Sequence, residues 1–217
     1  MNPRLRRVGR DYFTRSLAPM LRVYGERIVK EKGAEWRQWN PFRSKLAAGL
    51  SAGLDDLHIR AGDSVLYLGS AEGTTVSHVS DLVGENGFVV GVDISPKAMR
   101  VFSKLVESRS NIIPLLADAN HPALLKKELP DMKFDVIVQD VSQKNQSDIF
   151  VRNWETFASK SAHGYLVIKS RSIDFSKNPS LVLKGEEARI KKHCSIREVV
   201  DLGKFEKDHF LVHVVWK

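Results

Sequence analysis

The sequence has little cysteine and no long hydrophobic run, and each absence excludes a class of protein. A single cysteine, Cys194, stands among 217 residues, so no disulfide can form within the chain, and we expect a small buried apolar side chain there. No stretch approaches the roughly 18 uninterrupted apolar residues of a transmembrane helix. Residues 1–7 also lack the apolar segment of a secretory signal. We therefore expect a cytoplasmic protein with no membrane partner.

The motifs of several common enzyme classes are missing as well. The Walker A loop of nucleoside triphosphatases is not present, and the run Gly49-Leu-Ser-Ala-Gly53 falls inside a predicted helix, so it is not the strand-to-helix G-x-S-x-G elbow of many hydrolases. The sequence has no C-x-x-C pair, and its 7 histidines do not follow a metal-ligand spacing. These absences argue against a hydrolase or a triphosphatase, and they predict no metal site.

Positive charge is plentiful but unevenly placed. The net charge is +8, and residues 1–45 hold 12 Lys and Arg against 4 Asp and Glu, whereas residues 46–217 hold 22 of each sign. Positive charge concentrated in this way is typical of a surface that meets a polyanion, although it also fits an ordinary soluble basic surface.

Residues 1–42 lack the periodicity of a long helix. Residues 22–30 alternate imperfectly between apolar and polar, residues 32–33 form a turn signal, and residues 35–39 are extended and aromatic-rich. We predict a small antiparallel β appendage over residues 1–42, with a hairpin. Its interleaved Arg, Tyr and Trp side chains can stack on bases, pack on a partner or form the core of that sheet.

A strand, a glycine turn and a helix follow one another in residues 65–84. Residues 65–68 are an apolar run typical of a buried strand, Gly69 and Gly73 bracket a tight turn, and Thr74 or Thr75 can cap the helix that follows. This arrangement is the first half of a βαβ unit, in which a ligand lies over the carboxyl end of the strand.

The next strand, residues 87–92, ends in Asp93, about 20 residues past the turn, where an acid suits a pair of ribose hydroxyls. The turn is G-x-x-x-G rather than G-x-G-x-x-G, which argues against a dinucleotide and is typical of S-adenosylmethionine (SAM) methyltransferases. Glycines needed for packing alone would give the same turn.

Strands and helices alternate through the rest of the chain, which predicts an α/β doubly wound fold from residue 43 to residue 217. The last two strands match the antiparallel end of a methyltransferase sheet. The further predicted strands are residues 111–117, 134–139, 164–169, 196–202 and 210–216. The other predicted helices are residues 44–54, 96–109, 149–160 and 181–192.

Charged side chains recur where these strands end. Asp93, Asp118, Asp140 and Lys169 each fall at the carboxyl end of a predicted strand, and such ends share one crevice. Each Asp alone also fits an ordinary turn. Asp118 can accept a hydrogen bond from an adenine amino group, and Asp140 can pair with Lys169 on the neighbouring strand.

Two further residues are placed unusually. Lys45 falls in the first turn of a predicted helix, where the helix dipole disfavours a cation, although a solvated lysine is the ordinary explanation. His209 follows Asp208 in a loop directly before the last predicted strand. Both are candidates for chemistry at the crevice.

Longer motifs resemble the fibrillarin family in its short archaeal form, over nearly the whole chain, without the glycine- and arginine-rich tail of eukaryotic members. These motifs are Arg22-Val-Tyr-Gly-Glu26, Trp39-Asn-Pro, Ser44-Lys-Leu-Ala-Ala48, the run from Tyr67 to Asp81, Asn111-Ile-Ile-Pro114, Asp118-Ala-Asn120, Asp140-Val-Ser-Gln143, Ile168-Lys169 and Phe205-Glu-Lys-Asp-His209.

The resemblance implies a Rossmann-like class I SAM-dependent methyltransferase fold with a seven-stranded, mostly parallel sheet. It implies guide-RNA-directed 2′-O-methylation of ribose in rRNA, and in tRNA, as the catalytic subunit of a box C/D ribonucleoprotein. The implied partners are the guide RNA, a Nop5-type scaffold protein and an L7Ae-type RNA-binding protein.

The resemblance also assigns roles to residues. It implies SAM contacts by the turn residues, by Asp93 and Ile94 at the ribose and adenine, by Asp118 and Ala119 at the adenine, and by two residues that close the site. Family members often carry Glu and then an aromatic residue where this chain has Asp93 and Ile94, so less stacking on adenine is expected. The full cofactor set is Gly69, Ala71, Gly73, Thr74, Thr75, Asp93, Ile94, Asp118, Ala119, Asp140 and Gln143.

The family's catalytic tetrad maps onto Lys45, Asp140, Lys169 and His209. In this hypothesis Lys169, positioned by Asp140, removes or shares the proton of the 2′-hydroxyl, while Lys45 and His209 orient that hydroxyl. A non-catalytic SAM-binding subunit and a protein glutamine methyltransferase are the alternatives. The basic N-terminal region favours RNA as the substrate, and the glycine spacing disfavours a nicotinamide enzyme.

Overall fold

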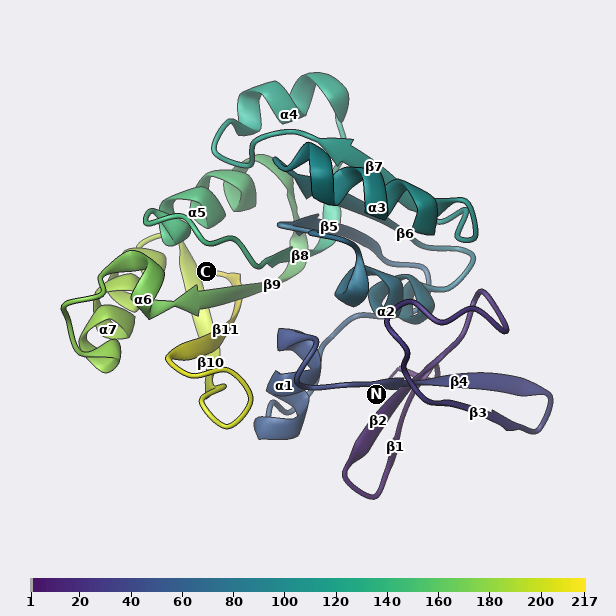
Figure 1. Ribbon diagram of the computed structural model, residues 1–217. Helices are drawn as coiled ribbons and strands as arrows, with labels where there is room; N and C mark the ends of the chain where they lie inside the picture. Colours follow the sequence, from purple (N-terminus) through teal and green to yellow (C-terminus); the bar gives the residue numbers. More distant parts are fainter. Residues whose placement is uncertain (1) are drawn as a thin grey trace.

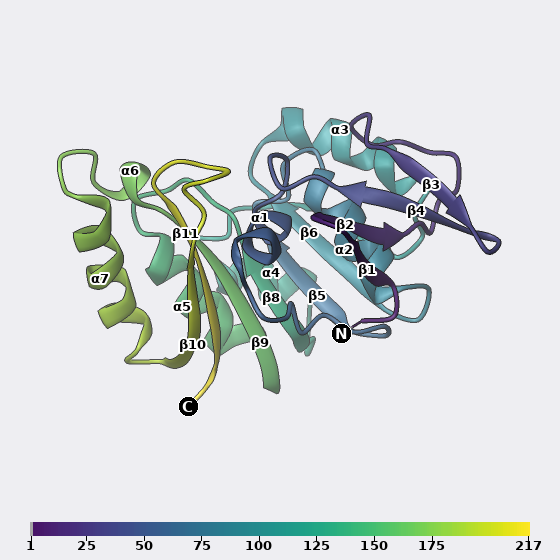
Figure 2. The same ribbon diagram turned by 90° about the horizontal axis from the view of Figure 1, so that it is seen from below.

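Two sheets organise the chain in the computed structural model, which describes residues 2–217. A four-stranded antiparallel sheet is formed by the N-terminal residues, and a seven-stranded sheet with helices on both faces is formed by the rest (Figure 1). In the view of Figure 2, the four-stranded sheet lies on one side of the molecule, and the C-terminal strands with helix α7 lie on the opposite side. The predicted α/β class with a small N-terminal β appendage is confirmed.

The N-terminal sheet has the order β1-β2-β4-β3. Its strands are β1 (Leu5–Val8), β2 (Asp11–Arg15), β3 (Ile28–Glu31) and β4 (Ala34–Trp39). The predicted hairpin is β3–β4, whose two turn residues, Lys32 and Gly33, both have positive φ, as a tight hairpin turn requires. Trp39 is 1% exposed, so this aromatic belongs to the core.

The seven-stranded sheet has the order β10-β11-β9-β8-β5-β6-β7. Six strands run in the same direction, and β11 runs antiparallel between β9 and β10, as predicted for the C-terminal end. Because β5 pairs with β6 on one side and with β8 on the other, the chain reverses its direction of winding there, which opens a crevice at the carboxyl ends. The strands are β5 (Ser64–Leu68), β6 (Phe88–Asp93), β7 (Ile112–Leu116), β8 (Phe134–Gln139), β9 (Ala158–Lys169), β10 (Cys194–Asp201) and β11 (His209–Trp216).

Helices cover both faces of this sheet and define two hydrophobic cores. One face packs against α1 (Lys45–Ala52), α2 (Thr74–Val83) and α3 (Pro96–Val106). The other face packs against α4 (Pro122–Glu128), α5 (Gln146–Phe157) and α7 (Pro179–Ile190), and the short α6 (Ser170–Ile173) follows β9. Residues of α2 are almost all buried because the N-terminal sheet covers the side of α2 that faces away from the large sheet.

Several local predictions were wrong. Helix α2 is capped by Gly73 at φ +89°, with no side-chain cap, rather than by Thr74 or Thr75. Phe102 and Leu105 fill the space that a Cβ of Gly73 would need. His209 is the first residue of β11 rather than part of the preceding loop. Helices α4 and α6 and strands β1 and β2 were not predicted individually, because each is only 4 to 7 residues long. Within residues 2–217, no helix combines the length and hydrophobicity needed to cross a bilayer.

Buried ion pairs join the N-terminal sheet to the rest of the molecule. On β4, Arg37 pairs with Glu26 at 2.6 Å and with Asp81 of α2 at 2.7 Å. Arg109, which follows α3, pairs with the other Asp81 oxygen at 2.7 Å. All four side chains are 0% exposed, so part of the N-terminal positive charge is neutralised inside the protein.

Candidate active site

The carboxyl ends of the central strands border a cavity of about 540 Å³. We call this cavity the crevice. It brings together ten of the residues that the sequence singled out, from six separate segments of the chain. These are Lys45, Gly69, Ala71, Asp93, Ile94, Asp118, Ala119, Asp140, Gln143 and Lys169.

The turn after β5 fixes the floor of the crevice. Gly69 has φ +84°, and a Cβ on it would lie 2.6 Å from the carbonyl oxygen of Asp140. Only glycine fits there, because β8 passes so close. The backbone N–H groups of Gly69 and Ser70 donate to the carbonyl of Val92 at 2.8 and 3.0 Å, which ties the turn to β6.

Asp93 is held in place by the backbone around it. One carboxylate oxygen accepts from the N–H of Ala71 at 2.8 Å, and the other accepts from the N–H of Ser95 at 2.8 Å. Each oxygen keeps a further lone pair, so the carboxylate can accept two hydroxyl hydrogen bonds from the crevice. Ile94 beside it is 57% exposed and offers an apolar surface.

Polar groups also stand at the far end of the crevice. A carboxylate oxygen of Asp118 accepts from the backbone N–H of Asn120 at 2.8 Å, which orients the side chain. Among the described residues, the buried Oε1 of Gln143 has no hydrogen-bond partner. A buried acceptor without a partner fits a ligand that brings an N–H donor, such as an adenine amino group.

A second cavity, of about 450 Å³, adjoins the crevice and shares Lys45, Gly69, Ala71 and Asp140 with it. Its lining includes two of the predicted cofactor residues, Thr74 and Thr75, and Ser70, whose buried Oγ has no partner among residues 2–217. Gly73 lines neither cavity, and its place at the start of α2 is explained by packing.

Three of the four predicted catalytic residues form one charged cluster. The Lys169 Nζ lies 2.7 Å from Oδ1 of Asp140 and donates to Oγ of Ser142 at 3.0 Å. The Lys45 Nζ lies 3.9 Å from Oδ2 of the same Asp140. Asp140 therefore lies between two lysines that come from β9 and from the start of α1.

His209 is near this cluster in the sheet, but within residues 2–217 its side chain forms no hydrogen bond or ion pair with Lys45, Asp140 or Lys169. It pairs in register with Lys169 across β11 and β9, and its Nδ1 lies 2.7 Å from the carbonyl oxygen of Lys207. Its catalytic role stays a prediction.

Two neighbours of the lysines were not predicted from the sequence. The Glu206 carboxylate lies 3.8 Å from Nζ of Lys45, which is also 3.9 Å from the carboxylate of Asp140. The side chain of Gln146 accepts from the backbone N–H of Lys169 at 2.9 Å and fixes the end of β9. The only signal for Glu206 was its place in the motif of residues 205–209, and Gln146 had none.

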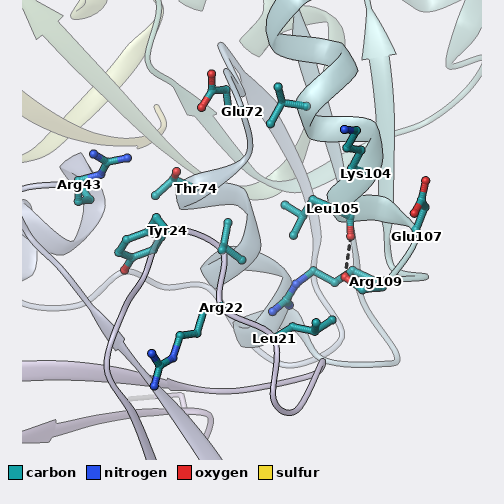
Figure 3. A pocket seen from close by; sticks show the side chains of 13 residues that line it. Leu21, Arg22, Tyr24, Arg43, Glu72, Thr74, Lys104, Leu105, Glu107 and Arg109 are labelled. Atoms are coloured by element: carbon teal, nitrogen blue, oxygen red, sulfur yellow. Dashed lines mark hydrogen bonds between the residues drawn. The ribbon is translucent and has the colours of Figure 1, made fainter.

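A third cavity, also of about 540 Å³, lies between residues 21–24 and α3 (Figure 3). It reaches the second cavity through Arg43, Glu72 and Thr74, which line both. Figure 3 shows Arg22 and Tyr24 on one side of it and Lys104 and Glu107 on the other. No strand-end carboxylate lines this cavity, so we assign the chemistry to the crevice.

The fold and the crevice define the class: a Rossmann-like α/β protein with the class I SAM-dependent methyltransferase fold. The glycine turn, the acid at the end of β6 and the Lys-Asp-Lys cluster all face the same crevice.

The chain belongs to the fibrillarin family, whose model matches residues 5–217. It is 44% identical over 198 residues to the fibrillarin-like rRNA/tRNA 2′-O-methyltransferase of Pyrococcus abyssi, covering 91% of this chain and 86% of that relative. The structure of Aeropyrum pernix fibrillarin in complex with natively bound SAM has a TM-score of 0.86 and 41% identity, covering 94% of this chain and 89% of the other. A chain of a fibrillarin/Nop5p complex has a TM-score of 0.89 and 33% identity, covering 100% and 99%. The predicted family resemblance is confirmed.

Proposed function

We propose that this protein is a SAM-dependent RNA methyltransferase that modifies ribose 2′-hydroxyls of rRNA, and of tRNA, as the catalytic subunit of a box C/D ribonucleoprotein. The observation that carries the proposal is the Lys169–Asp140 pair at 2.7 Å, which lines the same crevice as the oriented carboxylate of Asp93. The similarity to named rRNA/tRNA 2′-O-methyltransferases supports the same reaction.

The residues around the crevice fit SAM. Asp93 would accept from the ribose hydroxyls, Asp118 and Gln143 would take the adenine end, and the Gly69 turn would hold the methionine end. The adjoining cavity gives Thr74 and Thr75 access to the methionine end. When bound, SAM supplies an activated methyl group on a positively charged sulfur.

The lysines act on the substrate hydroxyl. A ribose 2′-hydroxyl is a weak nucleophile, so it must be placed in line with the methyl group and relieved of its proton as the O–C bond forms. The neutral amine of Lys169 takes or shares that proton, which leaves an ammonium group that Asp140 holds in position from 2.7 Å away. Lys45, also beside Asp140, and His209 orient the hydroxyl oxygen. General base assistance of this kind is worth about 10² to 10⁴ in rate.

The target is selected by other molecules in this proposal. A guide RNA pairs with the substrate RNA, a Nop5-type scaffold holds the catalytic subunit, and an L7Ae-type protein holds the guide RNA. The similar chain in a fibrillarin/Nop5p complex supports the scaffold partner, and the N-terminal excess of positive charge favours RNA nearby. A cytoplasmic location is part of the same proposal.

The test is methyl transfer from SAM to a guide-matched RNA, with guide RNA and both partner proteins present and then omitted one at a time. We expect transfer to a single ribose 2′-oxygen in the complete mixture, and none when the guide is mismatched. Measurable SAM binding with no transfer in the complete mixture would contradict the proposal and favour a non-catalytic subunit. Transfer to a glutamine of a partner protein instead would favour a protein methyltransferase.

A further inference from the structure

Three histidines that are far apart in the sequence meet on the large sheet, away from the crevice. His213 on β11 lies opposite Tyr165 on β9, and His163 is two residues before Tyr165 on the same strand. His163 and His213 therefore share one face of the sheet. His58, in the connection between α1 and β5, lies over them. His163 precedes Lys169 by six residues of extended strand, roughly 20 Å, so this cluster is separate from the catalytic lysines.

We propose that His58, His163 and His213 form a binding site for a late first-row divalent metal ion such as Zn²⁺. One ring nitrogen from each of the three lies within 4.8 Å of the other two. Nδ1 of His163 and Nε2 of His213 are 2.9 Å apart. Tetrahedral Zn²⁺ with Zn–N distances of about 2.0–2.1 Å places its ligand nitrogens roughly 3.3 Å apart. The His163–His213 separation is shorter than that value and the third nitrogen lies within 4.8 Å of both, so rotations of the rings complete the site.

The His58 ring has to move the most. It stacks parallel to His163, with ring centroids 4.2 Å apart and an angle of 2° between the planes, so its nitrogens do not yet point between the other two rings. His58 is only partly buried, which leaves room for that rotation. The two strand histidines are already in hydrogen-bonding contact and form the fixed part of the site.

The backbone around His58 is shaped to present it. His58 has φ +45°, in the left-handed region, where histidine is among the more frequent residues other than glycine. The same segment is anchored on both sides of it. Arg60 pairs with Asp56 at 2.6 Å, and the hydroxyl of Tyr165 donates to the carbonyl of Asp56 at 3.3 Å.

The chemistry of the cluster selects the metal. The group contains only histidines, and imidazole nitrogens suit Zn²⁺, Cu²⁺ and Ni²⁺, whereas Mg²⁺ and Ca²⁺ prefer oxygen ligands. The hydrogen bond between His163 and His213 places one proton between the two facing nitrogens, and this proton leaves, or moves to the other nitrogen of its ring, when both nitrogens bind the metal. Nearby Arg60 and Arg197 oppose a cation, and Asp56 favours one. A bound ion would tie the segment around His58 to the sheet.

The experiment is calorimetric titration of the full chain, without a histidine tag and freed of metal by a chelator, with Zn²⁺. We expect saturable binding of one ion per chain, no comparable binding of Mg²⁺, and a higher melting temperature in the presence of Zn²⁺. With Co²⁺ as the probe, we expect the intense visible absorption of tetrahedral coordination.

Two ligand variants and one control make the assignment specific. His58→Asn is chosen because asparagine also tolerates the positive φ of this position. We expect His58→Asn and His163→Asn each to weaken Zn²⁺ binding by at least about tenfold, since loss of even an outer-sphere partner has an effect of that size. His193→Asn removes an exposed histidine that pairs with Glu155, and it should bind as the wild type does. Absence of saturable Zn²⁺ binding by the wild type, or unchanged affinity in both ligand variants, would overturn the proposal. If a variant fails to fold, the Co²⁺ spectrum of the wild type decides: a spectrum without tetrahedral bands overturns it.

Discussion

Replacing Asp93 by alanine should weaken SAM binding while leaving the fold intact. Both oxygens of this carboxylate are oriented by backbone N–H groups, of Ala71 and of Ser95, each at 2.8 Å. The carboxylate is therefore preorganised, and little of its binding energy is spent on ordering it. The N–H group of Ala71, which loses its acceptor, borders the crevice, so water can replace the carboxylate there.

The size of the effect follows from the hydrogen bonds lost. A ribose would donate two hydroxyl hydrogen bonds to Asp93, and hydrogen bonds to a charged group contribute about 1.5 to 3 kcal/mol each. Because water replaces part of this interaction, we expect a loss of about 2 to 4 kcal/mol of binding free energy, which raises the dissociation constant for SAM about 30- to 1,000-fold.

The assay is calorimetric titration of SAM into the wild type, Asp93→Ala and Asp93→Glu, with the melting temperature of each protein as the folding control. The longer carboxylate of Asp93→Glu can still accept both hydroxyls, so it should stay within about tenfold of the wild type. If Asp93→Ala folds normally and binds SAM as the wild type does, the ribose is not held by this residue and the assignment is refuted.

Three further predictions test the fold and the cofactor site. Arg37→Met should lower the free energy of unfolding by about 3 to 5 kcal/mol in urea denaturation, because it leaves the buried carboxylate of Glu26 without a charged partner and leaves Asp81 with Arg109 alone. Burial, together with nearby arginines, holds the pKa of His78 well below 6.5, so the unfolded chain binds the extra proton. The contribution of His78 to the free energy of unfolding is complete above pH 6.5 and falls by up to about 1.4 kcal/mol per pH unit below that value. His78→Gln should lack this contribution to the pH dependence, as urea denaturation midpoints measured between pH 7.5 and 5 would show. Ile94→Tyr, at an exposed position of the crevice, should tighten SAM binding by about 1 kcal/mol, about fivefold, through stacking on adenine, as titration calorimetry would show.

Each of these expectations can fail in a recognisable way. Arg37→Met within about 1 kcal/mol of the wild type would mean that the ion pairs are dispensable. Parallel pH profiles for the wild type and His78→Gln would mean that this histidine does not contribute to acid sensitivity. An unchanged or weaker SAM affinity of Ile94→Tyr would place the adenine away from that side chain.

The glycine turn and the strand-end charges were predictable because local sequence determines them. Residues 65–84 carry a short apolar run, two glycines at a fixed spacing and a helical period, and the structure has β5, the turn and α2 there. Parallel strands end at one edge of a sheet, so Asp93, Asp140 and Lys169 had to meet once the strands were assigned correctly.

Residues whose environment depends on long-range packing could not be predicted. The sequence counts Arg37 among the N-terminal positive charges, yet it is fully buried between Glu26 and Asp81, and no local pattern distinguishes it from an exposed arginine. The same holds for Glu206, which reaches Lys45 only because the connection between β10 and β11 folds back toward α1.

The histidine cluster shows the limit of motif spacing. His58, His163 and His213 come from a loop and two strands, and only the antiparallel pairing of β9 with β11 brings the latter two together. A search for ligands at short, regular intervals therefore finds no metal site in a chain whose fold gathers three imidazoles.

The most direct test of the central claim is the single-turnover rate of methyl transfer to a guide-matched RNA by the assembled complex, with wild-type protein, Lys169→Ala and Lys160→Ala. Lys160 is an exposed lysine on the same strand as Lys169 and serves as the matched control. We predict that Lys169→Ala transfers the methyl group at least about 100-fold more slowly, because the proton acceptor of the 2′-hydroxyl is lost, with SAM affinity near that of the wild type. Lys160→Ala should retain the wild-type rate. A wild-type rate for Lys169→Ala would contradict the assignment of Lys169 as the residue that activates the ribose hydroxyl.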